Sequence, residues 1–139
     1  MKRAAGLSGL SRDHHTALVL ARRAEHAAAS DDRTASVEWQ KIAEFFRTDL
    51  ELHFRIEEQS LLPALADAGE AALVERTLSE HARLRKLSLE SSHRYLQEFS
   101  SLLHAHIRFE EQVLFQRAQE ILDRPALDAV GTRYRALRD

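Results

Sequence analysis

The peptide HFRIEEQ at residues 53–59 returns near the end of the chain as HIRFEEQ at residues 106–112. In each copy a His and a Glu lie four residues apart, within a pattern whose apolar residues recur every three or four positions. That period predicts an α-helix, and residues four apart on a helix lie on one face. Both helices therefore point an imidazole and a carboxylate toward the interior. Because buried charged groups are costly unless they are paired, any fold of this chain must bring partners to them.

The composition favours helices throughout. Only four Gly and two Pro occur among 139 residues, and Ala, Leu, Glu and Arg dominate. We predict an all-α fold, an up-down-up-down antiparallel four-helix bundle, because short connections between consecutive helices imply antiparallel neighbours. The chain is expected to form one domain over residues 1–139, with the bundle at about 8–121. Residues 122–139 are expected to form either a short fifth helix or a lightly packed tail.

Local signals predict where the helices begin and end. Ser8 and Ser11 are candidate caps for the first helix, and the sequence SDDRT at residues 30–34 resembles a turn. Pro63 is expected to kink the last turns of the second helix. The four expected helices cover about residues 8–29, 36–68, 70–91 and 93–121.

Charge and cysteine content exclude several classes of function. The 20 basic and 22 acidic residues give a net charge of −2, and the basic residues are dispersed, so nothing indicates a nucleic-acid or membrane surface. The chain has no Cys, which excludes thiolate metal sites and disulfides and fits a reducing compartment. No apolar run approaches the roughly 18 residues of a membrane span or forms a signal peptide. These features predict a cytoplasmic protein whose partner is a small ligand.

The apolar face of each expected helix contains polar residues as well. When the inward positions are assigned at coiled-coil spacing, they include an imidazole on all four helices and a carboxylate on two of them. The inward residues lie at similar distances from the turns, and at about 1.5 Å rise per residue the mismatches stay within one helical turn. We therefore expect six groups to meet at one level of the bundle: His14, His53, Glu57, His81, His106 and Glu110.

The choice between His14 and His15 on the first helix rests on the residues that follow. We prefer His14, because His15 would bring Arg22 and Glu25 inward. The same spacing continues the inward face through Ser60 and Ala64 on the second helix and through Val113 on the fourth.

Residues next to the inward groups are predicted to face solvent. A step of one residue turns about 100° around a helix, so neighbours of the inward groups are expected on a solvated face rather than in support of them. These neighbours are Asp13, Glu58, Glu80 and Glu111. The remaining imidazoles are also expected at the surface: His26, His93 and His104.

Four imidazoles and two carboxylates cannot satisfy one another by hydrogen bonds, because their donors and acceptors are unbalanced. Divalent cations would use every nitrogen lone pair and both carboxylates. Nitrogen and oxygen donors without sulfur suit iron or manganese and can suit zinc. Two ions are predicted rather than one, since two carboxylates can bridge ions about 3.5–4 Å apart. The ferritin-like motif Glu-x-x-His has the reverse order and a shorter spacing, so the sequence points to another class.

The repeated HxxxEE motif, with LSRDHH at residues 10–15 and LSEH at 78–81, resembles the hemerythrin-like, or HHE cation-binding, family of non-haem di-iron four-helix bundles. The resemblance covers about residues 8–121 and implies oxygen, nitric oxide or peroxide as the ligand. It also implies two iron ions with a bridging oxo or hydroxo group, although manganese or zinc would suit the donors. The ligands that it implies are terminal imidazoles and bridging carboxylates: His14, His53, His81 and His106, then Glu57 and Glu110.

One departure from the family concerns Arg85. Oxygen-carrying hemerythrins have a fifth His one turn after the third-helix ligand, and this chain has Arg85 at that position. The corresponding site on the iron is then filled by solvent or another residue, or it stays open. We expect a protein that binds or senses oxygen or a related oxidant. The alternatives are a peroxide-decomposing or oxidase enzyme, an iron store or donor, and a metal-free helical interaction module.

Overall fold

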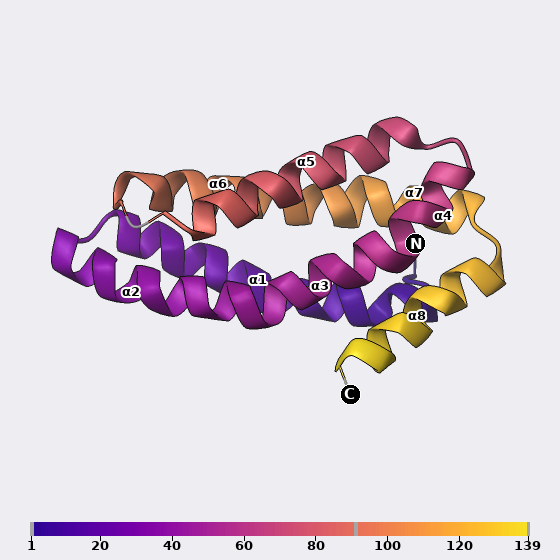
Figure 1. The fold of residues 1–139 in the computed structure, drawn as a ribbon, viewed down its shortest axis with the longest axis horizontal. Helices are drawn as coiled ribbons and strands as arrows, with labels where there is room; N and C mark the ends of the chain where they lie inside the picture. Colours follow the sequence, from indigo (N-terminus) through magenta and orange to yellow (C-terminus); the bar gives the residue numbers. More distant parts are fainter. Residues whose placement is uncertain (1, 91, 139) are drawn as a thin grey trace.

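The computed structural model describes residues 2–90 and 92–138, and Figure 1 shows them as a bundle of helices. These two ranges contain no strand, so the prediction of an all-helical fold is confirmed. Within the same ranges, no helix combines the length and the apolar character needed to cross a membrane. The α-helices are α1 (Ala5–Ala28), α2 (Asp32–Phe45), α3 (Glu51–Ile56), α4 (Leu62–Asp67), α5 (Ala71–Ser88), α6 (Arg94–Phe109), α7 (Phe115–Ile121) and α8 (Arg124–Arg138). The π-helical turns are η1 (Phe46–Leu50), η2 (Glu57–Leu61) and η3 (Glu110–Leu114).

The π-turns join α-helices into longer rods. The first rod is α1, the second runs from α2 through α4, the third is α5, and the fourth consists of α6, η3 and α7. Helix α1 packs against α2 and α6, while α5 packs against α4 and α6.

The start of α1 is fixed by tertiary contact rather than by a local cap. The prediction that Ser8 and Ser11 cap this helix is wrong, because α1 already begins at Ala5 and the Ser8 hydroxyl donates to the Ala5 carbonyl at 2.8 Å. The backbone N–H of Ala4 instead donates to Oε1 of Gln119 at 2.7 Å. A contact between residues so distant in the chain could not be anticipated from local sequence.

The expected turn at residues 30–34 is partly helical. Asp31 is the N-cap of α2, and its side chain accepts from the backbone N–H of Thr34 at 2.8 Å. Helix α2 therefore begins at Asp32, four residues before the predicted start. The other expected boundary is present, since Gly69 follows α4 with φ of 94°, a left-handed conformation that favours glycine.

Two π-turns begin at the inward carboxylates. The backbone N–H of Leu62 donates to the carbonyl of Glu57, and that of Phe115 donates to the carbonyl of Glu110, five residues back in both cases. Such widened turns often occur at functional sites in helices. Pro63 stands in the first turn of α4, directly after η2, and Figure 1 shows α3 and α4 inclined to α2.

The two π-turns η2 and η3 also change which residues face the interior after them. A widened turn contains one residue more than an α-helical turn, so the inward face moves by one position. Val113 is 42% exposed, whereas Leu114 is fully buried. Ser60 and Ala64 are half-buried, and Leu61 is fully buried. The prediction based on uninterrupted coiled-coil spacing is therefore wrong beyond each Glu.

Two apolar clusters fill the interior, and polar side chains lie between them along the rods. On α1, Leu7 and Leu10 belong to the smaller cluster and the buried residues from Ala17 onward belong to the larger one. The larger cluster includes Trp39 and Phe99, whose rings meet edge to face at 5.3 Å. The aromatic residues buried in these clusters include Trp39, Phe46, Phe54, Phe99 and Phe109.

The C-terminal segment forms the helix α8, so the first of the two predicted alternatives for residues 122–139 is correct. Figure 1 shows α8 turning back from the end of α7, and α8 packs against α1, α3 and η2. Two glycines make the crossing with α1 close. A Cβ on Gly6 would overlap the carbonyl oxygen of Leu127, and a Cβ on Gly131 would lie 3.2 Å from the Cα of Gly6.

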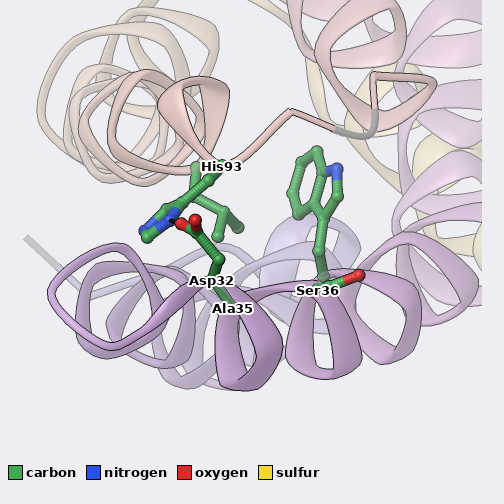
Figure 2. A pocket seen from close by; sticks show the side chains of 6 residues that line it. Asp32, Ala35, Ser36 and His93 are labelled. Carbon is green, nitrogen blue, oxygen red and sulfur yellow. Dashed lines mark hydrogen bonds and ion pairs between the residues drawn. The ribbon is translucent and has the colours of Figure 1, made fainter.

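His93 lies away from the six inward groups. It is half-buried rather than fully exposed, and its ring nitrogens contact Oδ1 of Asp32 at 2.7 Å and the carbonyl of Ala28 at 2.8 Å. His93 and Asp32 both lie beside a surface cavity (Figure 2). Its volume is about 270 Å³. The cavity is lined by Asp32, Ala35, Ser36, Trp39, His93 and Leu96. None of these residues belongs to the predicted metal site.

The substitution Gly6→Ala tests the close crossing of α1 and α8. Helix propensity alone would make Ala more stable than Gly by about 1 kcal/mol. Overpacking costs about 1–3 kcal/mol, and the overlap here is with backbone, so we expect a net loss of stability and a lower Tm in thermal unfolding. Gly131→Ala is the matched control, since its Cβ meets nothing closer than 3.2 Å, and it should lower Tm less. An unchanged or higher Tm in Gly6→Ala would contradict the packing described.

Candidate metal centre

The structure brings all six predicted site residues to one level between the two apolar clusters. All six are between 0% and 4% exposed. We call them the polar layer: His14, His53, Glu57, His81, His106 and Glu110. Their ligand atoms fall into two groups, and within each group they lie within 4.8 Å of one another: His14, His53, Glu57 and Glu110, then Glu57, His81, His106 and Glu110. Both carboxylates belong to both groups.

Of the two adjacent imidazoles on α1, His14 lies in the polar layer. Its side chain is buried, whereas His15 is exposed. The preference for His14 therefore agrees with the structure. The agreement concerns the inward position of His14, and its role as a metal ligand stays a prediction.

The four imidazoles of the polar layer all turn Nε2 toward the shared carboxylates. The shortest distance from each Nε2 to an oxygen of Glu57 or Glu110 lies between 2.9 and 3.2 Å. Glu57 is four residues after His53, and Glu110 is four residues after His106, so each of these pairs comes from one helical face. The i, i+4 spacing thus gives the second and the fourth rod one nitrogen and one oxygen donor each at the same level.

Several of these inward atoms lack a hydrogen-bond partner, although they are buried. They are both carboxylate oxygens of Glu57, Oε2 of Glu110, and Nε2 of His81 and of His106. Buried polar atoms are normally hydrogen-bonded, because an unsatisfied one costs free energy. Lone pairs of nitrogen and oxygen that converge in this way would be satisfied by divalent cations. The residues present therefore fit a pair of metal ions.

The outer nitrogen of each imidazole contacts a further carboxylate. The Nδ1 to oxygen distances lie between 2.7 and 3.0 Å. We call these residues the outer carboxylates: Glu111 on His14, Asp13 on His53, Glu58 on His81 and Glu80 on His106. Because a carboxylate accepts the Nδ1 proton, it fixes the ring orientation and leaves Nε2 free to bind a cation.

The prediction that the outer carboxylates face solvent is wrong. The step of about 100° from an inward position does turn the side chain out of the core. In a bundle, however, that direction points at the neighbouring rod rather than at water. The doubled Glu in both copies of HxxxEE was the available signal, since the second Glu of each copy is Glu58 or Glu111.

Each outer carboxylate is in turn paired with an arginine. The distances from the guanidinium nitrogens to the carboxylate oxygens lie between 2.8 and 3.3 Å. The pairs are Arg3 with Glu111, Arg76 with Glu80, Arg85 with Glu58, and Arg138 with Asp13. The charges therefore alternate in sign outward from the polar layer.

Arg85, at the position of the fifth His of oxygen carriers, faces away from the inward atoms. Its guanidinium donates to Glu51 and Glu58 at distances between 2.8 and 3.1 Å. Guanidinium has no lone pair to offer, so Arg85 cannot bind a cation. The ligand group around His81 and His106 accordingly contains no third imidazole among the described residues.

Comparison with known families agrees with this geometry. The family model for the hemerythrin HHE cation-binding domain matches residues 5–118. The chain belongs to the hemerythrin HHE cation-binding family. No curated protein and no solved structure matches it. The match contains the whole polar layer and ends before α8. The chain is therefore a hemerythrin-like metal-binding protein whose buried His and Glu side chains could hold the metal.

Without a cation, the imidazoles of this hemerythrin-like site are strongly basic. Burial alone would lower the pKa of His81, but the nearby carboxylates of Glu110, Glu57 and Glu58 outweigh it and raise the pKa to about 10. Burial would also lower the pKa of His106, but the charge of Glu110 outweighs this effect and raises the pKa to about 9. At neutral pH both rings are protonated in the metal-free protein, and a cation must displace these protons.

The stability of the metal-free protein should depend on pH through these imidazoles. The pKa values of His81 and His106 in the folded state are about 10 and about 9, above the ordinary value of 6.5. Their contribution to stability is therefore fully present below pH 6.5 and is lost as pH rises through 9 to 10. Denaturant unfolding of chelator-treated protein should show a decreasing free energy of unfolding over that range. A free energy that increases from pH 7 to 10 would contradict the expectation.

The adjacent residues His14 and His15 provide a matched pair of substitutions for metal binding. Loss of a residue that only supports a ligand lowers metal affinity about 10- to 100-fold. Loss of a ligand should cost at least as much, so we expect about 100-fold weaker binding of one ion in His14→Ala and unchanged binding in His15→Ala. The measurement is competition for the metal against a chromophoric chelator. Equal behaviour of the two variants would exclude His14 as a ligand.

Proposed function

We propose that this chain is a non-haem di-iron protein that binds or senses oxygen or a related small oxidant, such as nitric oxide or peroxide. The observation that carries the proposal is the sharing of Glu57 and Glu110 by two groups of ligand atoms. Two carboxylates common to both groups would hold two cations at bridging distance. Membership of a cation-binding family supports the same conclusion.

The donor set suits iron, the cation of this proposal, and would also suit manganese or zinc. Each group offers two imidazoles and two shared carboxylates, and no Cys occurs in the chain. Nitrogen and oxygen donors of this kind suit iron or manganese, with zinc as a further candidate. Four protein donors leave positions on an octahedral ion for a small ligand. When bound, a pair of iron ions would supply the electrons for chemistry with dioxygen or peroxide.

The protein's own side chains hold and shield the ligands. Phe54 lies flat against the imidazole of His81, with centroids 3.8 Å apart and 13° between the rings. Phe115 is nearly parallel to the ring of His14 at 5.4 Å. These apolar rings keep water from the imidazoles, while the outer carboxylates hold the Nδ1 protons. A dry and rigid surround of this kind favours retention of a small bound oxidant.

The proposal also includes the arrangement of the four rods and the location of the protein. An antiparallel up-down-up-down order within one domain is supported by the short connections between rods. It is also supported by packing, since α1 lies against α2 and α6, and α5 lies against α4 and α6. The absence of Cys supports a reducing compartment, which we propose is the cytoplasm.

A second candidate function is decomposition of peroxide, favoured by the position of Arg85. Its guanidinium is engaged by Glu51 and Glu58, so the two groups of the polar layer offer equal sets of donors. Without a third imidazole on one side, a small oxidant has more open positions, which favours turnover over reversible carriage. Oxygen evolution from added peroxide would support this function, whereas stoichiometric release of iron to an acceptor without turnover would support an iron store.

The test of the proposed function begins with anaerobic loading by ferrous iron, followed by exposure to oxygen, nitric oxide or peroxide. We expect new near-ultraviolet and visible charge-transfer bands. They should be absent in Glu110→Gln, which removes a shared carboxylate charge, and present in the control Glu75→Gln, whose side chain is exposed on α5. An iron-loaded protein that shows no new band with any of the three oxidants would contradict the proposal.

A further inference from the structure

Two side chains of α8 hydrogen-bond one of the outer carboxylates, Asp13. The hydroxyl of Tyr134 donates to Oδ1 of Asp13 at 2.9 Å, and Nη2 of Arg138 donates to Oδ2 at 2.8 Å. Oδ2 also accepts from Nδ1 of His53 at 3.0 Å. Asp13 is therefore fixed on one side by α8 and on the other by an imidazole of the polar layer.

The packing of α8 on α1 sets the position of Tyr134. A Cβ on Gly9 would lie within 2.8 Å of the Tyr134 ring, so the ring rests against a surface that only glycine leaves open. Arg138 follows one helical turn after Tyr134, and its guanidinium carbon lies 5.5 Å from the centre of the Tyr134 ring. These two residues consequently reach Asp13 from the same face of α8.

The other outer carboxylates are held differently. Arg76 and Arg85, which hold Glu80 and Glu58, lie on α5, and Arg3, which holds Glu111, precedes α1. Asp13 is held by residues that lie beyond residues 5–118, the range that the family model matches. The contacts made by α8 thus come from outside the matched range, and they meet the outer carboxylate of one imidazole, His53.

We propose that Tyr134 and Arg138 are positioning residues, which act through Asp13 on His53 and thereby make tight binding at the His14–His53 metal position depend on the docking of α8. With both Asp13 oxygens fixed, the His53 ring keeps Nδ1 outward and Nε2 toward Glu57. This inference rests on the proposed metal centre. It adds that the two metal positions differ, because in the described part of the chain the side chains of α8 hydrogen-bond the outer carboxylate of His53 and not those of His81 and His106.

The experiment measures binding of Zn²⁺ alone, by competition against a chromophoric chelator, in two backgrounds. His106→Ala impairs one position and leaves the His14–His53 position, whereas His14→Ala does the reverse. In the His106→Ala background, Arg138→Gln and Tyr134→Phe should each weaken Zn²⁺ binding about 10- to 100-fold. In the His14→Ala background, neither substitution should change the affinity. Such a difference between backgrounds isolates the coupling of α8 to one position.

Controls separate positioning from a general loss of structure. Arg133→Gln removes a positive charge from an exposed position on the same helix and should leave Zn²⁺ binding unchanged in both backgrounds. Arg76→Gln gives the mirror result, because Arg76 holds Glu80, the partner of His106. Arg76→Gln should weaken Zn²⁺ binding in the His14→Ala background and have no effect in the His106→Ala background.

A second measurement uses the full chain with both metal positions intact. Release of Zn²⁺ to excess chelator should be biphasic, and Tyr134→Phe, which keeps the ring on Gly9, should accelerate one phase about tenfold or more. Equal weakening in both backgrounds, or no effect of either α8 substitution, would overturn the inference. Failure of the unsubstituted chain to bind Zn²⁺ and iron would instead refute the proposed metal centre.

Discussion

The burial of two carboxylates and four imidazoles at one level of the bundle is the constraint on which the other features depend. Removing such groups from water costs more than their mutual contacts return unless the geometry is complete. Here the inward atoms converge without forming a complete set of hydrogen bonds, and neither oxygen of Glu57 has a hydrogen-bond partner. In the metal-free protein the basic imidazoles compensate part of this cost through their charge. Cations would compensate it more fully, since each lone pair would gain a partner.

The organisation around that level follows from the same electrostatic requirement. Each imidazole contacts an outer carboxylate, and each outer carboxylate contacts an arginine. Opposite charges at short range stabilise one another, so each charged group of the site has a neighbour of opposite sign. Arg85 belongs to this outermost set and engages Glu58, which explains how the chain uses a position that holds a ligand in oxygen carriers. Helix α8 contributes Arg138 and Tyr134, which both hydrogen-bond the outer carboxylate Asp13.

The sequence was sufficient for the helical fold and for the residues of the polar layer, because both follow from periodicity. It was insufficient where the period changes or where partners are distant in the chain. The π-turns that start at Glu57 and Glu110 move the inward face by one residue, so Val113 is exposed where burial was expected. The roles of Asp13 and Glu80 depend on which rods are neighbours, and the helical period of one rod does not contain that information. The docking of α8 likewise depends on the crossing at the α1 glycines.

The most direct measurement for the central claim is crystallography of the iron-loaded protein with anomalous data collected on both sides of the iron absorption edge. We expect two iron peaks in the polar layer, both within ligand distance of Glu57 and Glu110, with His14 and His53 on one ion and His81 and His106 on the other. A single peak, a pair of peaks outside the layer, or iron bound only at the protein surface would contradict the claim that cations complete the buried site.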